Sequence, residues 1–284
     1  MRILVFGSTG MLGHTLIKYL QNQNSLEVEF TVRDKTKQKI CQKIFGKEAN
    51  FLFDADHPES ALDAIRTFQP NICINCLGLI KQKDDSKNYL KSIRINSLIP
   101  HIISEYCREY DSKLIHISTD CVYSGRKGNY SEEDLPDPLD FYGRSKLLGE
   151  VSNNNALTIR TSIIGPELST SKGLFEWFRS CDDVIYGYSN AWFSGFPTVE
   201  LSRIIFEHII SKNIKNDIYN LSSKPINKFN LLKLINEAYG LNKKILVDES
   251  VNVDRTLNCS KFMKETNFES EEWQVMIDRM KSFK

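Results

Sequence analysis

A short apolar run at the start of the chain leads directly into a glycine-rich turn. Residues 3–6 read Ile-Leu-Val-Phe, and Gly7-Ser8-Thr9-Gly10-Met11-Leu12-Gly13 follows at once. Glycines allow a tight turn, and the helix that begins there offers backbone N–H groups to an anion. A strand, such a turn and a helix in this order are typical of a dinucleotide-binding unit. The residues expected at the cofactor are Gly7, Thr9, Gly10, Met11, Leu12 and Gly13. In the alternative interpretation one glycine serves the turn, the other two serve packing, and no cofactor binds there.

Short β-rich runs alternate with amphipathic stretches through the first 165 residues, which predicts a parallel sheet wound by right-handed crossovers. The expected strands are Arg2–Phe6, Val28–Val32, Phe51–Phe53, Ile72–Cys76, Lys113–Ser118 and Leu157–Thr161. The expected helices are Met11–Gln21, Lys35–Phe45, Glu59–Phe68, Tyr89–Tyr110 and Tyr142–Ser152. Two prolines and two glycines make residues 124–140 a loop.

The alternation weakens after Gly165-Pro166. Helices are expected at Leu201–Ile210, Asn230–Tyr239 and Glu271–Ser282, and strands at Val184–Tyr186, Ile218–Leu221 and Lys244–Val247. The prediction is an α/β protein with a Rossmann-type doubly wound parallel sheet in a dinucleotide-binding domain, residues 1–165. Residues 166–284 form a smaller α+β substrate lobe, from which the chain returns once to the sheet.

Composition limits the classes of partner. The 284 residues contain 37 Lys and Arg against 36 Asp and Glu, so no global field attracts nucleic acid or an anionic membrane. No apolar run approaches the roughly 18 residues of a membrane-spanning helix. We therefore expect a cytoplasmic protein with small-molecule partners, and a homodimer is left open.

The seven cysteines are scattered, which suits a reducing compartment. Cys73 and Cys76 form a C-x-x-C, but it lies in an apolar run where positions three apart point to opposite faces of a strand. Two buried thiols are expected there. No metal site is expected, because zinc would need further ligands and no histidines are paired at ligand spacing.

The end of the second expected strand decides between the two dinucleotides, because an acidic residue there binds a ribose hydroxyl whereas an arginine accommodates a 2′-phosphate. Arg33 stands at that place and favours NADP(H), although Asp34 follows at once and would reverse the preference if the strand ended one residue later. Further cofactor contacts are expected where the third, fourth and fifth strands end, at Asp54, Ala55, Cys76, Leu77, Gly78 and Ser118.

Tyr142 and Lys146 stand four residues apart, on one face of a helix. A phenol titrates near ~10, so a nearby ammonium is needed to favour phenolate and ease proton exchange near neutrality. Thr119, where the fifth strand ends, can donate to the same substrate oxygen as Tyr142. In this geometry Lys146 holds the nicotinamide ribose, so that Tyr142 and Lys146 contact cofactor as well as taking part in the chemistry.

The glycine turn, Ser118-Thr119-Asp120-Cys121-Val122-Tyr123-Ser124-Gly125, the Tyr142 and Lys146 pair and Arg160-Thr161-Ser162 together resemble the dTDP-4-dehydrorhamnose reductases, among the extended short-chain dehydrogenases. The resemblance implies NADPH-dependent reduction of a nucleotide-bound 4-keto-6-deoxy sugar in nucleotide-sugar biosynthesis. It makes Thr119, Tyr142 and Lys146 catalytic residues and places Asp120 and Ser162 at the sugar. Ile163 stands where these reductases carry an aromatic residue, so a UDP-linked 2-acetamido-4-keto sugar is a competing substrate.

Single positions distinguish the reductase from related functions of the same fold. A dehydratase would place Asp-Glu after the threonine, whereas Asp120 is followed by Cys121. An epimerase would fit an acidic residue better than Arg33. A non-catalytic, NADP-binding regulatory subunit stays open, although intact Thr119, Tyr142 and Lys146 argue against it.

Two positions in the second lobe are candidate substrate contacts. Asn190 lies in the aromatic-rich stretch 186–195, which suits stacking of a base, or a turn with its aromatics in the core. Arg255 resembles an arginine that meets the nucleotide phosphates, with a surface salt bridge as the alternative.

Overall fold

A computed structural model describes residues 1–80, 88–169, 171–181 and 184–283. The chain folds into two compact units. The N-terminal unit comprises Met1–Ser118, Asp140–Ile159 and Lys215–Ile218, and the C-terminal unit comprises Thr119–Leu139, Arg160–Ile214 and Tyr219–Lys284.

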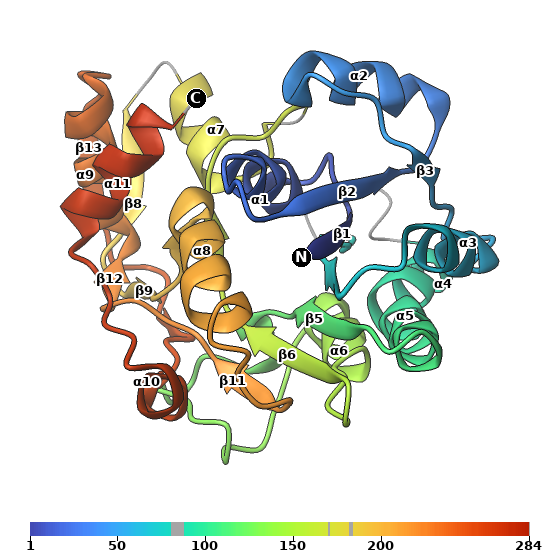
Figure 1. The fold of residues 1–284 in the computed structure, drawn as a ribbon. Coiled ribbons are helices and arrows are strands. Elements are labelled where there is room, and N and C mark those ends of the chain that lie inside the picture. Colours follow the sequence, from blue (N-terminus) through green and yellow to red (C-terminus); the bar gives the residue numbers. More distant parts are fainter. Residues whose placement is uncertain (81–87, 170, 182–183, 284) are drawn as a thin grey trace. The chain divides into compact units, whose positions relative to one another are not determined.

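A seven-stranded sheet with the order β11-β6-β5-β4-β1-β2-β3 organises the N-terminal unit (Figure 1). The pairings from β3 to β6 are parallel. The strands are β1 (Arg2–Phe6), β2 (Glu27–Val32), β3 (Phe51–Leu52), β4 (Ile72–Asn75), β5 (Lys113–Ile117), β6 (Ala156–Arg160) and β11 (Ile218–Asn220). This order is that of a doubly wound Rossmann-type sheet, so the predicted fold class is confirmed. At β11 the chain returns to the sheet edge, where Thr158 N donates to Asp217 O over 3.0 Å.

The helices of this unit follow the predicted alternation closely. They are α1 (Met11–Gln21), α2 (Lys35–Phe45), α3 (Glu59–Phe68), α4 (Tyr89–Ser92), the π-helical segment η2 (Ile93–Leu98), α5 (Ile99–Glu109) and α6 (Phe141–Leu148). Two details differ from expectation. The stretch 89–110 is not one regular helix, because η2 interrupts it. Helix α6 ends before Ser152, because Val151 N turns to the side chain of Thr158 in β6 (3.0 Å).

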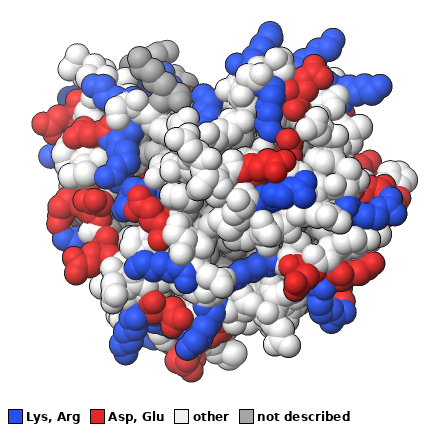
Figure 2. Space-filling view, viewed as in Figure 1, with Lys and Arg blue, Asp and Glu red and all other residues white. Residues whose placement is uncertain are grey.

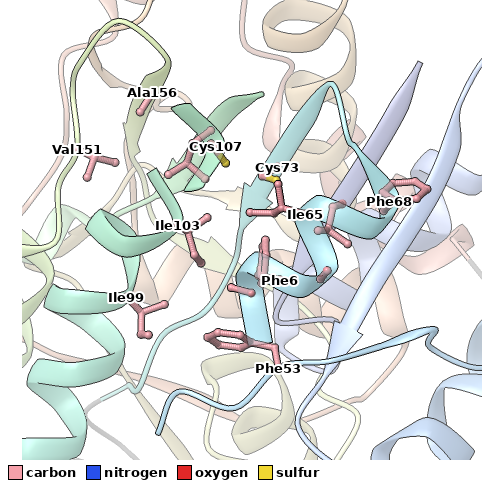
Figure 3. Packing of buried hydrophobic residues seen from close by; sticks show 14 residues of the cluster. Phe6, Phe53, Ile65, Phe68, Cys73, Ile99, Ile103, Cys107, Val151 and Ala156 are labelled. Carbon is pink, nitrogen blue, oxygen red and sulfur yellow. The ribbon is translucent and has the colours of Figure 1, made fainter. Parts of the chain in front are cut away.

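A buried apolar cluster lies between one face of the sheet and helices α3 and α5 (Figure 3). Strand residues alternate between faces, so Leu4 and Phe6 of β1 point to the same side and meet this cluster. Phe6 packs edge to face on Phe53, with ring centroids 5.5 Å apart. Cys73 lies in the same cluster, and burial raises the pKa of its thiol well above the ordinary value. Burial likewise raises the pKa of Cys76 to about 12.

The C-terminal unit contains short strands in three small sheets, with the orders β10-β7, β12-β9-β14 and β13-β8. Its strands are β7 (Ile163–Ile164), β8 (Ile185–Tyr188), β9 (Ala191–Phe193), β10 (Phe196–Pro197), β12 (Ile226–Asn227), β13 (Ile245–Asp248) and β14 (Val253–Asp254). Its helical elements are η3 (Asp120–Val122), α7 (Leu174–Ser180), α8 (Thr198–Ile204), η4 (Ile205–Ile210), α9 (Lys228–Tyr239), α10 (Ser260–Thr266) and α11 (Trp273–Ser282). Helices α7 and α10 were not predicted.

The division between the units differs from the boundary at residue 165 that the sequence predicted. Residues 119–139 and 160–165 belong to the C-terminal unit. The reason is that the loop after β5 pairs with residues 256–258. Tyr130 N donates to Thr256 O (2.9 Å), and Asn258 N donates to Tyr130 O (2.7 Å).

Charged side chains of both signs are intermingled on the face that Figure 2 shows. This fits the near-zero net charge. Within the described ranges, no helix is both long enough and apolar enough to cross a membrane.

Candidate active site

The glycine turn between β1 and α1 is shaped by its own backbone contacts. Gly7 has φ +90°, and a Cβ there would lie 3.0 Å from the carbonyl carbon of Cys76. A Cβ on Gly13 would lie 2.1 Å from Gly7 O, so the first turn of α1 packs directly on the glycine turn. Gly7 and Gly13 are therefore required by the fold itself.

The start of α1 fits an anion such as a pyrophosphate. Gly10 is the N-cap residue, is exposed, and has no side chain with which to cap the helix. The first-turn N–H groups, those of Met11, Leu12 and Gly13, have no partner within the helix by geometry. Thr9 is half-buried beside them. An uncapped helix start of this kind favours negative charge.

Arg33 is the first residue after β2, which ends at Val32. Its side chain is 66% exposed, and its Nε lies 3.4 Å from Asp34 Oδ2. The Asp34 carboxylate caps α2 by accepting a hydrogen bond from Lys37 N (3.0 Å), and this bond lowers the pKa of Asp34. Arg33 is therefore the residue at the end of the strand, and the Asp34 carboxylate is already bound to the start of α2.

The segments after β3 and β4 lie at the carboxyl edge of the parallel sheet, where ligands of doubly wound folds bind. Asp54 is used in the local turn, since its Oδ1 accepts from Asp56 N (3.0 Å). Ala55 is half-buried, as are Cys76 and Leu77, and Gly78 is exposed.

Lys146 is buried at the end of β5, with only 3% of its surface exposed. Its Nζ donates to Ile117 O over 2.7 Å and lies 3.3 Å from His116 Nε2. Burial lowers the pKa of Lys146 to about 8, whereas the nearby Glu150 carboxylate acts in the opposite direction. Tyr142 precedes it by one helical turn in α6 and is half-buried. Asp140 caps α6, since its Oδ1 accepts a hydrogen bond from Gly143 N (2.8 Å). This cap sets the start of the helix that carries Tyr142 and Lys146.

Ser118 is buried directly after β5. Its Oγ donates to Glu150 Oε1 over 2.8 Å. The Glu150 carboxylate is thus held near the end of β5, where its negative charge raises the pKa of Lys146.

Sequence reasoning missed the polar side chains that support Lys146. Asn75 and His116 are register partners in β4 and β5, and both are fully buried. Asn96, in η2, is equally buried. The available signal was a single polar residue inside each of two apolar strands, since a buried polar group must find a partner.

Thr119 and Asp120 belong to the C-terminal unit, where they begin η3. Thr119 Oγ1 accepts from Cys121 N (3.2 Å) and donates to Asp120 Oδ1 (3.1 Å). Burial raises the pKa of Asp120, and the positive charge of Arg255 acts in the opposite direction. Arg255 Nε donates to Tyr123 O over 2.9 Å, so this arginine is anchored to the same loop. The unit brings Thr119, Asp120 and Arg255 together.

The remaining two predicted substrate contacts lie elsewhere in this unit. Ser162 is half-buried, and its carbonyl accepts from Phe196 N (2.9 Å). Asn190 is exposed, and its carbonyl accepts from Val253 N (3.0 Å). In the stretch 186–195, Tyr186 is 60% exposed whereas Phe193 is buried, so its aromatic residues are divided between surface and core.

Comparison with known proteins shows similarity to one protein family, to curated relatives and to solved structures. A model of the family described as RmlD substrate binding domain matches residues 1–170. The dTDP-4-dehydrorhamnose reductase of Aggregatibacter actinomycetemcomitans is 25% identical, over 79% of this chain and 74% of that protein. Methionine adenosyltransferase 2 subunit beta of Rattus norvegicus is 25% identical, over 84% of this chain and 72% of that protein. Among solved structures, dTDP-4-dehydrorhamnose reductase from Bacillus anthracis in complex with NADP has a TM-score of 0.79 at 18% identity, covering 98% of both chains.

Proposed function

This chain belongs to the RmlD substrate binding domain family, and from this membership we propose that it is an NADPH-dependent reductase of a nucleotide-linked 4-keto-6-deoxy sugar. A UDP-linked 2-acetamido-4-keto sugar is the competing substrate, because Ile163 replaces the aromatic residue of the dTDP-4-dehydrorhamnose reductases.

The observation that carries the proposal is the buried Nζ of Lys146, in a residue one helical turn from Tyr142. A positive charge close to a phenol stabilises the phenolate and so makes the phenol a better proton donor. A positioned proton donor of this kind contributes about 10²- to 10⁴-fold to a rate.

The N-terminal unit supplies what a dinucleotide needs. The uncapped start of α1 suits the pyrophosphate, and Arg33 at the end of β2 suits a 2′-phosphate. A structural relative that holds NADP supports the same choice of cofactor. When bound, NADPH supplies the hydride.

The chain's own residues have the following proposed roles. Tyr142 gives a proton to the substrate oxygen, Thr119 donates a hydrogen bond to that oxygen, and Lys146 orients the nicotinamide ribose. Asp120, Ser162, Asn190 and Arg255 contact the sugar nucleotide.

The test is NADPH oxidation with a panel of dTDP-, UDP- and GDP-linked 4-keto sugars, with products identified by NMR. Tyr142→Phe is expected to slow turnover of the best substrate by about 10²-fold or more while NADPH still binds. Tyr110→Phe, at the end of α5, is the matched control and is expected to behave as the wild type. Near-normal turnover in Tyr142→Phe refutes the assigned proton donor.

The similarity to methionine adenosyltransferase 2 subunit beta favours a second candidate, a dinucleotide-binding subunit of another enzyme. NADPH binding without oxidation by any sugar in the panel would support this candidate over the reductase.

A further inference from the structure

Four groups in the N-terminal unit form a continuous chain of hydrogen bonds that ends on Lys146. Leu77 N lies 3.0 Å from Asn75 Oδ1, and Asn75 Nδ2 lies 3.1 Å from His116 Nδ1. His116 Nε2 lies 3.3 Å from Lys146 Nζ. Asn75 and His116 are fully buried, and Lys146 is nearly so. Water therefore has little access to these bonds, and each group must be satisfied by its neighbour.

The donor and the acceptor in each of these hydrogen bonds can be assigned, because some of the groups can only donate. The backbone N–H of Leu77 is a donor, so the atom of Asn75 that faces it must be the amide oxygen. The amide nitrogen of Asn75 is then the atom that faces His116, and it donates to Nδ1. A neutral imidazole carries one proton, so that proton is on Nε2. Nε2–H can only donate, and the atom that it faces is Lys146 Nζ.

An ammonium cannot accept a hydrogen bond, whereas a neutral amine can. We infer that His116 is a positioning residue that stabilises the neutral amine form of Lys146 in the ligand-free protein, and that protonation of Lys146 reverses the imidazole tautomer. A neutral Nζ accepts from His116 and still donates to Ile117 O.

Reversing the His116 tautomer breaks one buried hydrogen bond. With Lys146 charged, its Nζ–H donates to a bare Nε2, and the imidazole proton moves to Nδ1. Asn75 must then turn its oxygen toward Nδ1, which places its amide nitrogen against Leu77 N–H, and two donors face each other. An unmade buried hydrogen bond opposes protonation, so the chain acts in the same direction as the burial that lowers the pKa of Lys146 to about 8.

The other ionisable groups around this chain are few among the described residues. The Glu150 carboxylate acts on Lys146 and favours its charged form, whereas the Cys76 thiol, with its pKa raised to about 12 by burial, stays neutral. His101 and Lys146 act on His116 and oppose its protonation, and burial lowers the pKa of His116 well below its ordinary value. The imidazole therefore stays neutral through the range in which Lys146 titrates.

The consequence deepens the proposed function and rests on it. Lys146 is a group that gains and loses a proton near neutrality, beside Tyr142, rather than a permanent positive charge. The protonation state itself needs no substrate, so it can be tested separately from turnover.

The experiment is ¹⁵N NMR of the ligand-free protein with labelled histidine, followed over a pH series on both sides of pH 8, the value to which burial lowers the pKa of Lys146. The His116 signals are assigned by their loss in His116→Gln. Above that pH we expect a proton on Nε2 and a bare Nδ1, and below it the opposite tautomer, with no imidazolium in between. A tautomer that is the same on both sides, or a proton on Nδ1 above it, overturns the inference. These outcomes do not depend on whether any sugar in the reductase panel is reduced.

Two variants sharpen the result. In Asn75→Asp a carboxylate accepts from both Leu77 N–H and Nδ1–H, so the Nδ1–H tautomer is expected at every pH and the Lys146 titration moves up by about one pH unit. Asn88→Asp adds the same charge at an exposed helix cap and is expected to keep the wild-type switch. Lys146→Met removes the group that drives the switch and is expected to leave the proton on Nε2 throughout. If Asn75→Asp fails to fold, the wild-type titration decides alone.

Discussion

Asn96 Nδ2 donates a hydrogen bond to Ser145 Oγ over 3.0 Å, and this bond joins the π-helical segment η2 to helix α6. The same amide holds the chain after β4, because its Oδ1 accepts from Leu79 N (2.8 Å) and its Nδ2 donates to Leu79 O (3.1 Å). A π-helical bulge inside an α-helix often accompanies a functional site. Here it accompanies the asparagine that connects η2 to the helix carrying Tyr142 and Lys146.

Asn96→Ala is expected to lower the free energy of unfolding by about 2 kcal/mol, because it leaves buried partners on Leu79 and Ser145 without their hydrogen bonds. Urea denaturation measures this change. Ser97→Ala, in the same segment, removes a single bond to Ser145 O (2.8 Å) and is expected to cost about 1 kcal/mol. Equal losses in the two variants would contradict a special role for the Asn96 amide.

Arg33→Ala is expected to weaken NADPH binding relative to NADH binding by about tenfold, since a charge-assisted contact to the 2′-phosphate is lost. Dissociation constants for both dinucleotides, measured by fluorescence titration, give the ratio. Lys35→Ala removes another exposed cation at the start of α2 and is the control. An unchanged ratio in Arg33→Ala would mean that a different residue recognises the phosphate.

The elements of the N-terminal unit were predictable because each carries its own apolar periodicity. The bounds of β1, α1, α2 and α3 agree with those expected from the sequence. The details that were missed depend on contacts between distant residues. Helix α6 ends early because Val151 N turns to the side chain of Thr158. The glycine at its end is also set by a distant contact, since a Cβ on Gly149 would lie 1.9 Å from Asn96 O, which no local pattern reveals.

The candidate site shows the same division. The spacing of Tyr142 and Lys146 is local, so the sequence predicted their common helix face. Asn75 and His116 are neighbours only because β4 and β5 pair in one particular register. In the C-terminal unit, the short strands and the loop around Tyr130 depend on pairing with residues far along the chain, which is why the two compact units do not divide at residue 165.

The fold makes stability depend on pH through His116. Burial holds the pKa of this imidazole well below its ordinary 6.5, so the folded chain keeps it neutral where the unfolded chain binds a proton. The stability is therefore fully present above about pH 6.5 and is lost as the pH falls below it, by up to about 1.4 kcal/mol per pH unit. Urea denaturation over a pH series is expected to show a shallower decline in His116→Gln. Parallel curves for the two proteins would exclude this linkage.

Glu200 of α8 is the buried centre of an ion-pair network in the C-terminal unit, with its side chain 1% exposed. It accepts from Arg203 Nη2 over 2.6 Å and from Arg279 of α11, so it holds two helices together. Glu200→Gln keeps the shape but leaves both guanidinium groups without their buried counter-charge, and we expect a loss of about 3 kcal/mol in the free energy of unfolding. Glu176→Gln breaks a pair with Arg179, whose side chain is 49% exposed, and is expected to cost less than about 1 kcal/mol. Thermal and urea denaturation of both variants make the comparison. A Glu200→Gln protein as stable as Glu176→Gln would show that the packing of α8 on α11, and not the buried carboxylate, holds these helices.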